Sequence, residues 1–236
     1  MITPVLWRRA RNRRQGGFCF SGVEQLADAS GQQRGVVYVD GFNLYYGCLK
    51  GSPYRWLDLG GLADLVMPGQ TVVAVKYFTA IVDDPLGSVR QQIYVSAAES
   101  DLRVSTYRGH FLTHTKRRPR KQSCDLCKDT HADVIITEEK GTDVNLATHL
   151  IYDACTDAFD VAAVISNDSD LAMPIVFARE KCGKTVGVLN PQAHPARALM
   201  RSVDFYKKIR SGVLAASQLP PTVTHEGRQL RKPMGW

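Results

Sequence analysis

VYVDGFN, residues Val37 to Asn43, is the stretch of sequence that decides the fold. An apolar run that begins at Val36 ends at Asp40 and is followed by a glycine, which is typical of a buried parallel strand that delivers its last side chain to a crevice. A second apolar run, Val161 to Ile165, ends in the polar residues SNDSD. Open parallel sheets bind ligands beyond the carboxyl ends of their strands. We therefore expect the ends of these two strands to converge on one site.

Strand and helix patterns alternate along the rest of the chain. Strands are expected at residues 36–40, 71–79, 103–108, 161–165 and 185–189. The clearest helix is expected from Thr142 to Ala154, where apolar residues recur at spacings of three and four, and another from Leu171 to Lys181. This alternation predicts an α/β fold with a mostly parallel sheet.

Three segments depart from this pattern. Residues 1–34 are basic and are interpreted as a flexible N-terminal extension, or as the product of a start codon assigned too early, whereas residues 35–210 form the expected domain. Within that domain, residues 109–131 are rich in Lys, Arg, His and Cys, which indicates an excursion between a strand and the following helix. Residues 211–236 lack periodicity and are expected to be an irregular C-terminal tail.

The composition favours a soluble protein. Apolar residues make up 44% of the 236 residues, and no apolar stretch approaches the roughly 20 residues that span a bilayer. No apolar stretch follows the basic N-terminus, as it would in a secretion signal. We therefore expect a cytoplasmic protein with no membrane partner, whose six cysteines are reduced thiols.

Four aspartates at predicted element boundaries suggest a metal site. Asp40 closes the first strand, Asp143 lies in the first turn of the clearest helix, and Asp168 and Asp170 follow the second apolar run. Mg²⁺ and Mn²⁺ prefer carboxylate oxygens and waters, with substrate phosphate completing the shell. A metal held in this way lowers the pKa of a bound water and suits hydrolysis of a phosphodiester. Asn43 would lie beside the metal and orient this water or the phosphate.

Each of these aspartates also has a structural interpretation. Asp168 lies among residues that cap helices well, and Asp143 is equally consistent with an ordinary first-turn acid stabilised by the helix dipole. Asp40 is harder to explain in this way, because a buried carboxylate must be paired or bound to a metal. The combination of the three boundaries favours a metal site.

The series of motifs resembles the NYN domain of LabA-like proteins, within the PIN-like nuclease superfamily. VYVDGFNLYYG is similar to the family's first strand motif, KGTDVNLATHLIYDA to its central helix motif, SNDSDLAMPI to its second acidic turn and GKTVGVLNP to the following strand. The resemblance covers approximately Gly35 to Ile209. It implies a Rossmann-like three-layer α/β/α sandwich and a metal-dependent ribonuclease that leaves a 5′-phosphate and a 3′-hydroxyl. The implied ligands of Mg²⁺ or Mn²⁺ are Asp40, Asp143, Asp168 and Asp170.

PIN-like enzymes often have a further acid on an intervening helix, for which only Glu99 and Glu139 are candidates here. A weak fourth ligand would reduce metal affinity. The alternative is therefore a non-catalytic RNA-binding or regulatory module that uses the same acidic pocket and a basic strip. A third hypothesis, a small-nucleotide phosphatase, predicts a preference for mononucleotides. The sequence does not identify the RNA target or decide between an endo- and an exonucleolytic mode. It is also compatible with a homodimer.

A basic strip in the excursion is a candidate contact for single-stranded RNA. The formal net charge is +7, of which residues 1–34 carry +4 and the remainder +3. Much of the remainder lies in KRRPRK, which contains Lys116, Arg117, Arg118, Arg120 and Lys121. Such a run either neutralises the phosphates of a polyanionic substrate or is an ordinary solvated loop.

The same excursion contains a candidate zinc site. Cys124 and Cys127 form a CxxC pair, and His114 and His131 lie nearby in the sequence. These residues could complete a structural Zn²⁺ site, but a single CxxC pair without standard finger spacing favours two reduced thiols in a loop. Outside the excursion, Tyr45 and Tyr46 are interpreted as packing residues that would stack on a base if exposed.

Overall fold

Six parallel strands form the central sheet of the computed structural model, which describes residues 31–82, 84–122 and 130–236. The strands are β1 (Gln33–Asp40), β2 (Gln70–Thr79), β3 (Val104–Arg108), β6 (Val161–Ile165), β7 (Thr185–Asn190) and β8 (Phe205–Lys208). Their order is β3-β2-β1-β6-β7-β8. The order reverses between β1 and β6, so the carboxyl ends of these two strands flank the switch point where open α/β sheets bind ligands.

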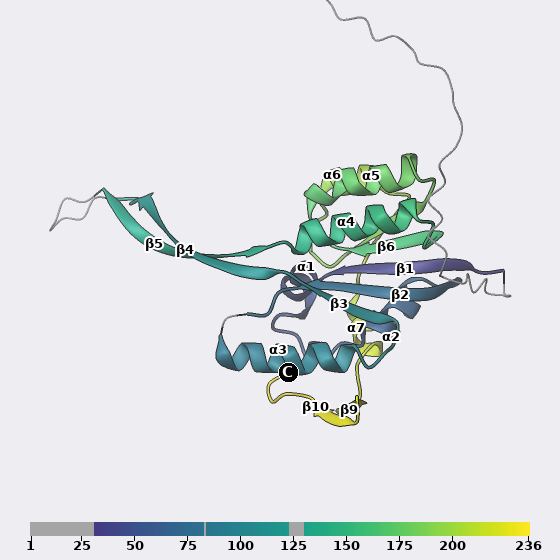
Figure 1. Cartoon of the computed structure of the whole chain (residues 1–236), viewed down its shortest axis with the longest axis horizontal. Coiled ribbons are helices and arrows are strands. Elements are labelled where there is room, and N and C mark those ends of the chain that lie inside the picture. Colours follow the sequence, from purple (N-terminus) through teal and green to yellow (C-terminus); the bar gives the residue numbers. More distant parts are fainter. Residues whose placement is uncertain (1–30, 83, 123–129) are drawn as a thin grey trace, which may run out of the picture. The chain divides into compact units, whose positions relative to one another are not determined.

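Helices cover both faces of the sheet (Figure 1). One face is covered by α4 (Thr142–Cys155), α5 (Ala172–Glu180) and α6 (Arg197–Ser202). The other is covered by α2 (Leu59–Val66), α3 (Pro85–Ala98) and α7 (Ser211–Ala216). This arrangement confirms the three-layer α/β/α sandwich. None of the described helices has the length and apolar character needed to cross a membrane.

The predicted strands and helices agree with the observed ones to within a few residues. The second apolar run and β6 have the same bounds, and the helix predicted from Thr142 extends one residue further, to Cys155. The helix predicted from Leu171 is α5, which begins and ends one residue inside the predicted range. β1 starts at Gln33, so the last two residues assigned to the N-terminal extension already belong to the sheet.

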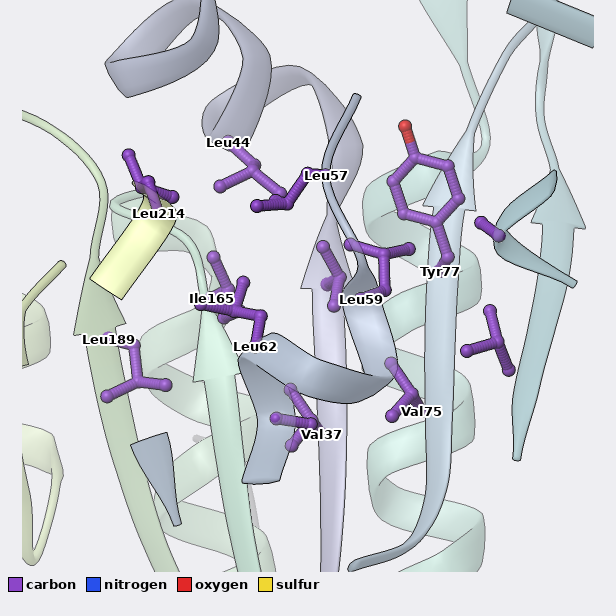
Figure 2. Close-up of a cluster of buried hydrophobic side chains, with 14 of the residues drawn as sticks. Val37, Leu44, Leu57, Leu59, Leu62, Val75, Tyr77, Ile165, Leu189 and Leu214 are labelled. Atoms are coloured by element: carbon purple, nitrogen blue, oxygen red, sulfur yellow. The ribbon is translucent and has the colours of Figure 1, made fainter. Parts of the chain in front are cut away.

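Burial on both faces explains why the central strands are continuous apolar runs. Val37 and Val39 of β1 point into the core beneath α2 and α3, and Val36 and Tyr38 point into the core beneath α4 and α5. Figure 2 shows the first of these cores, in which Val37, Val75 and Ile165 surround leucines such as Leu62. Each fully buried side chain of this kind contributes about 1.5–3 kcal/mol to folding.

Most of the described residues of the excursion at 109–131 belong to a β-hairpin arm. β4 (His110–Pro119) pairs with β5 (His131–Lys140) in an antiparallel ribbon that extends away from the central sheet (Figure 1). The residues of β4 are mostly exposed, so neither face of the ribbon carries the alternating apolar pattern that reveals a strand. Lys116, Arg117 and Arg118 lie within β4, so this part of the basic run is a strand and the alternative of an ordinary solvated loop does not apply to it.

The C-terminal segment is not irregular. After α7 it forms a hairpin of β9 (Thr222–His225) and β10 (Arg228–Arg231). Glu226 and Gly227 both have positive φ values, 47° and 75°, as a two-residue hairpin turn of type I′ requires. Glu-Gly is a weaker turn signal than Asn-Gly, which is why the sequence did not reveal this hairpin. Trp236 then packs against Trp56, with ring centroids 6.4 Å apart.

Candidate active site

Asp40 is held at the switch point by neutral hydrogen-bond donors. It ends β1 and is only 3% exposed. Its Oδ1 accepts from the backbone N–H of Asn43 at 2.9 Å, and its Oδ2 accepts from Asn43 Nδ2 at 2.7 Å and from Ser166 Oγ at 2.9 Å. Asp40 therefore caps α1 (Gly41–Leu44), the helix that follows it. The predicted pair of Asp40 and Asn43 is in direct contact.

Gly41 is needed for α1 to pack closely on β2. A Cβ at this position would lie 2.7 Å from the carbonyl oxygen of Phe78 and 2.9 Å from the ring of Tyr77. Both distances are shorter than real Cβ contacts, so any side chain would displace the helix. The glycine after the strand thus fixes the position of Asn43 relative to Asp40.

Ser166 links the carboxyl ends of β1 and β6. From the sequence, it was interpreted only as one of the residues that cap helices well. Its hydroxyl donates to Asp40 and accepts from the backbone N–H of Asp168 at 3.0 Å. Asp168 Oδ1 in turn accepts from the backbone N–H of Asp170 at 3.0 Å and caps the short 3₁₀ helix η2 (Ser169–Leu171). The structural interpretation of Asp168 as a cap is therefore correct, and its second carboxylate oxygen remains available for another ligand. The signal for Ser166 is its place directly after β6, the neighbour of β1.

Asp143 approaches the same site from the first turn of α4. Gly141 precedes this helix in the left-handed conformation, with φ of 98°, which favours glycine. The backbone N–H of Thr142 donates to Glu139 Oε1 at 3.0 Å, so Glu139 caps the helix start from the end of β5. The long pairing of β4 with β5 thus delivers both Glu139 and Asp143 to the carboxyl edge of the sheet.

The carboxylates act on one another electrostatically. Partial burial, followed by the charges of Asp40, Asp168, Glu139 and Asp170, raises the pKa of Asp143 to about 6. Burial raises the pKa of Asp40 above its ordinary value, and the charge of Asp168 adds to this rise, whereas the hydrogen bonds from Asn43 and Ser166 oppose it. Among the described residues, no Lys, Arg or His forms a salt bridge with any of these five acids. Their mutual repulsion is therefore uncompensated.

The donor set fits a hard divalent cation only in an open arrangement. Within the described part of the chain, no three His, Cys, Asp or Glu side chains come close enough together to enclose a metal ion. Mg²⁺, however, usually keeps several waters and is bound through one or two carboxylates plus substrate phosphate. Asp40 and Asp168, joined through Ser166, can supply those carboxylates.

The two candidates for a further acid differ in position. Glu139 lies at the site, where its charge acts on Asp143. Glu99 lies at the C-terminal cap of α3, which precedes the start of β3 and so belongs to the opposite edge of the parallel sheet. Glu99 is therefore excluded as a fourth acid of this site.

The arm does not bring the two predicted zinc-ligand histidines together. His114 pairs with Ile136, whereas His131 pairs with Pro119, five residue pairs further along the ribbon. At about 3.4 Å per residue, this places the two histidines about 17 Å apart. One zinc ion cannot bind both of them. Cys124 and Cys127 lie outside the described residues.

An aromatic cavity adjoins the acidic site on the other side of α1. It has a volume of about 300 Å³ and lies between α1, the following π-helical turn η1 (Tyr45–Leu49) and α3. Its walls include Phe42, Tyr46, Tyr94 and Trp236. Three basic residues also line it: Lys50, Arg55 and Arg90. The sequence did not reveal this cavity, because its lining comes from segments far apart in the chain.

The sheet order defines an open parallel α/β domain with an acidic switch point. A family model described as the NYN domain matches residues 34–210, and the chain therefore belongs to the NYN domain family. The resemblance found in the sequence motifs is confirmed.

Two comparisons extend this assignment. The chain is 29% identical over 235 residues to 6-hydroxy-3-succinoylpyridine 3-monooxygenase HspA of Pseudomonas putida, a match that covers 85% of this chain and 74% of that protein. The crystal structure of a protein of unknown function from Vibrio parahaemolyticus superposes with a TM-score of 0.51 at 17% identity. That match covers 81% of this chain and 99% of the other chain, and it supports the fold alone.

Proposed function

We propose that this protein is a metal-dependent ribonuclease that hydrolyses RNA phosphodiester bonds. The observation that carries the proposal is the group of carboxylates at the switch point, none of which has a cationic partner among the described residues. Buried or clustered carboxylates of this kind need a counter-charge. A divalent ion together with a substrate phosphate supplies it.

Asp40, Asp143 and Asp168 are the proposed ligands of Mg²⁺ or Mn²⁺, and Asp170 would bind a second ion or orient water. When bound, the ion would lower the pKa of a water and neutralise charge on the phosphoryl oxygens. Asn43 donates to Asp40 through Nδ2, which leaves its amide oxygen free to accept a hydrogen bond from the attacking water. By family resemblance, the products would carry a 5′-phosphate and a 3′-hydroxyl.

The basic strip of the arm is the proposed contact for the RNA backbone. Lys116 pairs with Val134 and Phe111 pairs with Glu139, so the strip begins five residue pairs, or about 17 Å, from the acidic site along the ribbon. Its charges, Lys116, Arg117, Arg118, Arg120 and Lys121, form no salt bridge among the described residues. They are therefore available to neutralise phosphates on a strand that extends from the site.

The test is cleavage of a 5′-labelled single-stranded RNA in the presence of Mn²⁺, of Mg²⁺ or of a chelator. We expect metal-dependent products from the wild type and a loss of at least about a hundredfold in Asp40→Asn, because the substitution removes a ligand charge without changing shape. Asp64→Asn is the matched control, since Asp64 is an exposed acid on α2 that forms a salt bridge with Arg103. It should cleave like the wild type.

Other outcomes would redirect or end the proposal. Full cleavage by Asp40→Asn would overturn the assignment of the site. Salt-sensitive RNA binding without products would favour the non-catalytic RNA-binding module. Hydrolysis of mononucleotides in preference to oligomers would favour the phosphatase.

A second candidate function is the oxidation of a small heteroaromatic acid, as stated in the name of the Pseudomonas putida relative. The observation that favours this function is the aromatic cavity, which adjoins α1 and is lined by three basic residues. Consumption of O₂ and of a reduced nicotinamide upon addition of 6-hydroxy-3-succinoylpyridine would support this function. Cleavage of RNA with no such consumption would exclude it.

A further inference from the structure

The aromatic cavity beside α1 has the chemistry of a ligand site. Its volume of about 300 Å³ lies at the lower end of the range for small-molecule pockets, which is roughly 300–1,000 Å³. The Tyr46 ring packs almost parallel to that of Phe42, with centroids 6.4 Å apart, yet the Tyr46 side chain is 59% exposed. An exposed, oriented ring of this kind offers a face on which a planar ligand can stack.

The opposite wall of the cavity is rigid. The Tyr94 hydroxyl donates to the carbonyl oxygen of Leu57 at 3.1 Å, and the Tyr94 ring packs against Trp236 with centroids 5.4 Å apart. Gln91 donates to the carbonyl oxygen of Ala80 at 2.9 Å and accepts from the backbone N–H of Val82 at 3.0 Å, which fixes the segment after β2. Preorganised walls reduce the cost of binding, because little side-chain freedom remains to be lost.

The cavity is also positively charged. Lys50, Arg55 and Arg90 line it, no Asp or Glu does, and none of the three forms a salt bridge among the described residues. Lys50 Nζ lies 4.8 Å from the centre of the Tyr46 ring, and the buried Nε of Arg55 has no hydrogen-bond partner. The Nη2 of Arg55 donates to the carbonyl oxygen of Gly235. Guanidinium groups that have no acidic partner bind phosphate and carboxylate groups.

The cavity and the acidic site share the short helix α1. Asn43 faces Asp40, whereas Gly41 and Phe42 line the cavity. Tyr77 lines the cavity, and its hydroxyl packs against the start of α1, where a Cβ on Gly41 would lie 3.0 Å from it. The cavity therefore lies against the same helix that follows Asp40.

We propose that this cavity binds a planar aromatic ring that carries an anionic group. Its ring stacks on Tyr46 and its anion is held by Arg55 and Arg90. Because the cavity adjoins the carboxylates, the ring and anion that fit best are the base and phosphate of the RNA nucleotide next to the cleaved bond. This choice rests on the proposed ribonuclease function. A small aromatic acid has the same chemistry and is distinguished by the experiment.

The experiment is a calorimetric titration of the full chain in chelator with AMP, adenosine, ribose 5-phosphate and nicotinate. We expect AMP to bind at least about tenfold more tightly than adenosine or ribose 5-phosphate, because each of these lacks one of the two recognised groups. Tyr46→Ala and Arg90→Gln should each weaken AMP binding by about tenfold or more. Tyr152→Ala and Arg201→Gln are matched controls: Tyr152 is 65% exposed on α4 and Arg201 is exposed on α6. Both should bind AMP like the wild type.

The outcomes separate this proposal from the proposed function. AMP binding that is lost in Tyr46→Ala and Arg90→Gln upholds the cavity even if RNA is never cleaved. Nicotinate binding with the same dependence, in the absence of AMP binding, upholds the ligand class and assigns it to a small acid. Failure of both compounds to bind, or binding that neither variant weakens, overturns the proposal, even in a protein that cleaves RNA.

Discussion

Asp153 and Asp40 are equally buried, 5% and 3% exposed, but their surroundings differ in charge. Asp153 Oδ2 accepts from the Tyr38 hydroxyl at 2.6 Å and pairs with Lys76 Nζ at 2.6 Å. Among the described residues, Asp40 accepts only from the neutral donors of Asn43 and Ser166. Neutral donors orient a carboxylate without cancelling its charge. Asp153 is therefore satisfied within the fold, whereas Asp40 retains a charge for a ligand.

The largest expected effect comes from breaking the satisfied pair. Asp153→Ala leaves Lys76 unpaired and the buried Tyr38 hydroxyl without its acceptor. Loss of one partner of a buried ion pair costs about 3–5 kcal/mol. We expect urea unfolding in chelator to show this loss, while Asp40→Asn changes the free energy of unfolding by less than about 1 kcal/mol.

A double substitution sharpens this test. Replacing both charges, in Lys76→Met combined with Asp153→Leu, removes the unpaired Lys76 charge but leaves the Tyr38 hydroxyl without its acceptor. This variant should recover the part of the lost stability that is due to the unpaired charge. A cost below about 1 kcal/mol for Asp153→Ala alone would contradict the structural role assigned to this pair.

The next largest effect is expected from breaking the link that Ser166 forms between the carboxyl ends of β1 and β6. Ser166→Ala removes the hydroxyl that joins Asp40 to the backbone of Asp168. Loss of a group that orients metal ligands commonly lowers metal affinity by about 10–100-fold, so we expect Mn²⁺ to bind at least about tenfold more weakly in a calorimetric titration. Ser217→Ala is the matched control, because Ser217 is also buried and donates to the carbonyl oxygen of Val213 at 2.9 Å, within α7. Equal Mn²⁺ affinity in Ser166→Ala and the wild type would exclude the link.

These contrasts also explain which parts of the structure could be predicted from the sequence. β6 was predicted to the residue because both of its faces are buried, which makes the run continuously apolar. The arm was missed because its residues are mostly exposed on both faces, so they show no alternation of apolar and polar residues. The position of Glu139 depends on the pairing of β4 with β5. Local patterns likewise contain no sign that Arg55, Arg90 and Trp236 line one cavity.

The feature that the sequence predicted least well was which buried carboxylate has a cationic partner. Asp40 and Asp153 both occur in ordinary apolar surroundings in the sequence, and only the fold places Lys76 beside one of them. Asp40 was nevertheless recognised, because a strand that ends in an acid before glycine places that acid at the sheet edge where ligands bind. The direct contact of Asn43 with Asp40 was not predicted, and it arises because Asp40 caps the helix that follows it and accepts from the backbone N–H of Asn43.

The smallest expected effect is a pH-dependent gain in stability from Asp143→Asn. The pKa of Asp143 rises in the folded protein from 3.8 to about 6, so the ionised form destabilises the metal-free fold. The stability that protonated Asp143 contributes is fully present below pH 3.8 and is lost as the pH rises through about 6. Such a rise corresponds to about 3 kcal/mol for an enclosed group, and solvent screening of the exposed Asp143 side chain reduces it to about 1 kcal/mol.

Asparagine carries no charge at any of these pH values. In chelator, Asp143→Asn should therefore be more stable than the wild type by about 1 kcal/mol at pH 7.5, and the difference should disappear near pH 4. Thermal unfolding between pH 4 and 8 measures it. Saturating Mn²⁺ should reverse the order, because the ion stabilises only the protein that retains its ligand. A gain that is independent of pH would show that the repulsion among the carboxylates is not its cause.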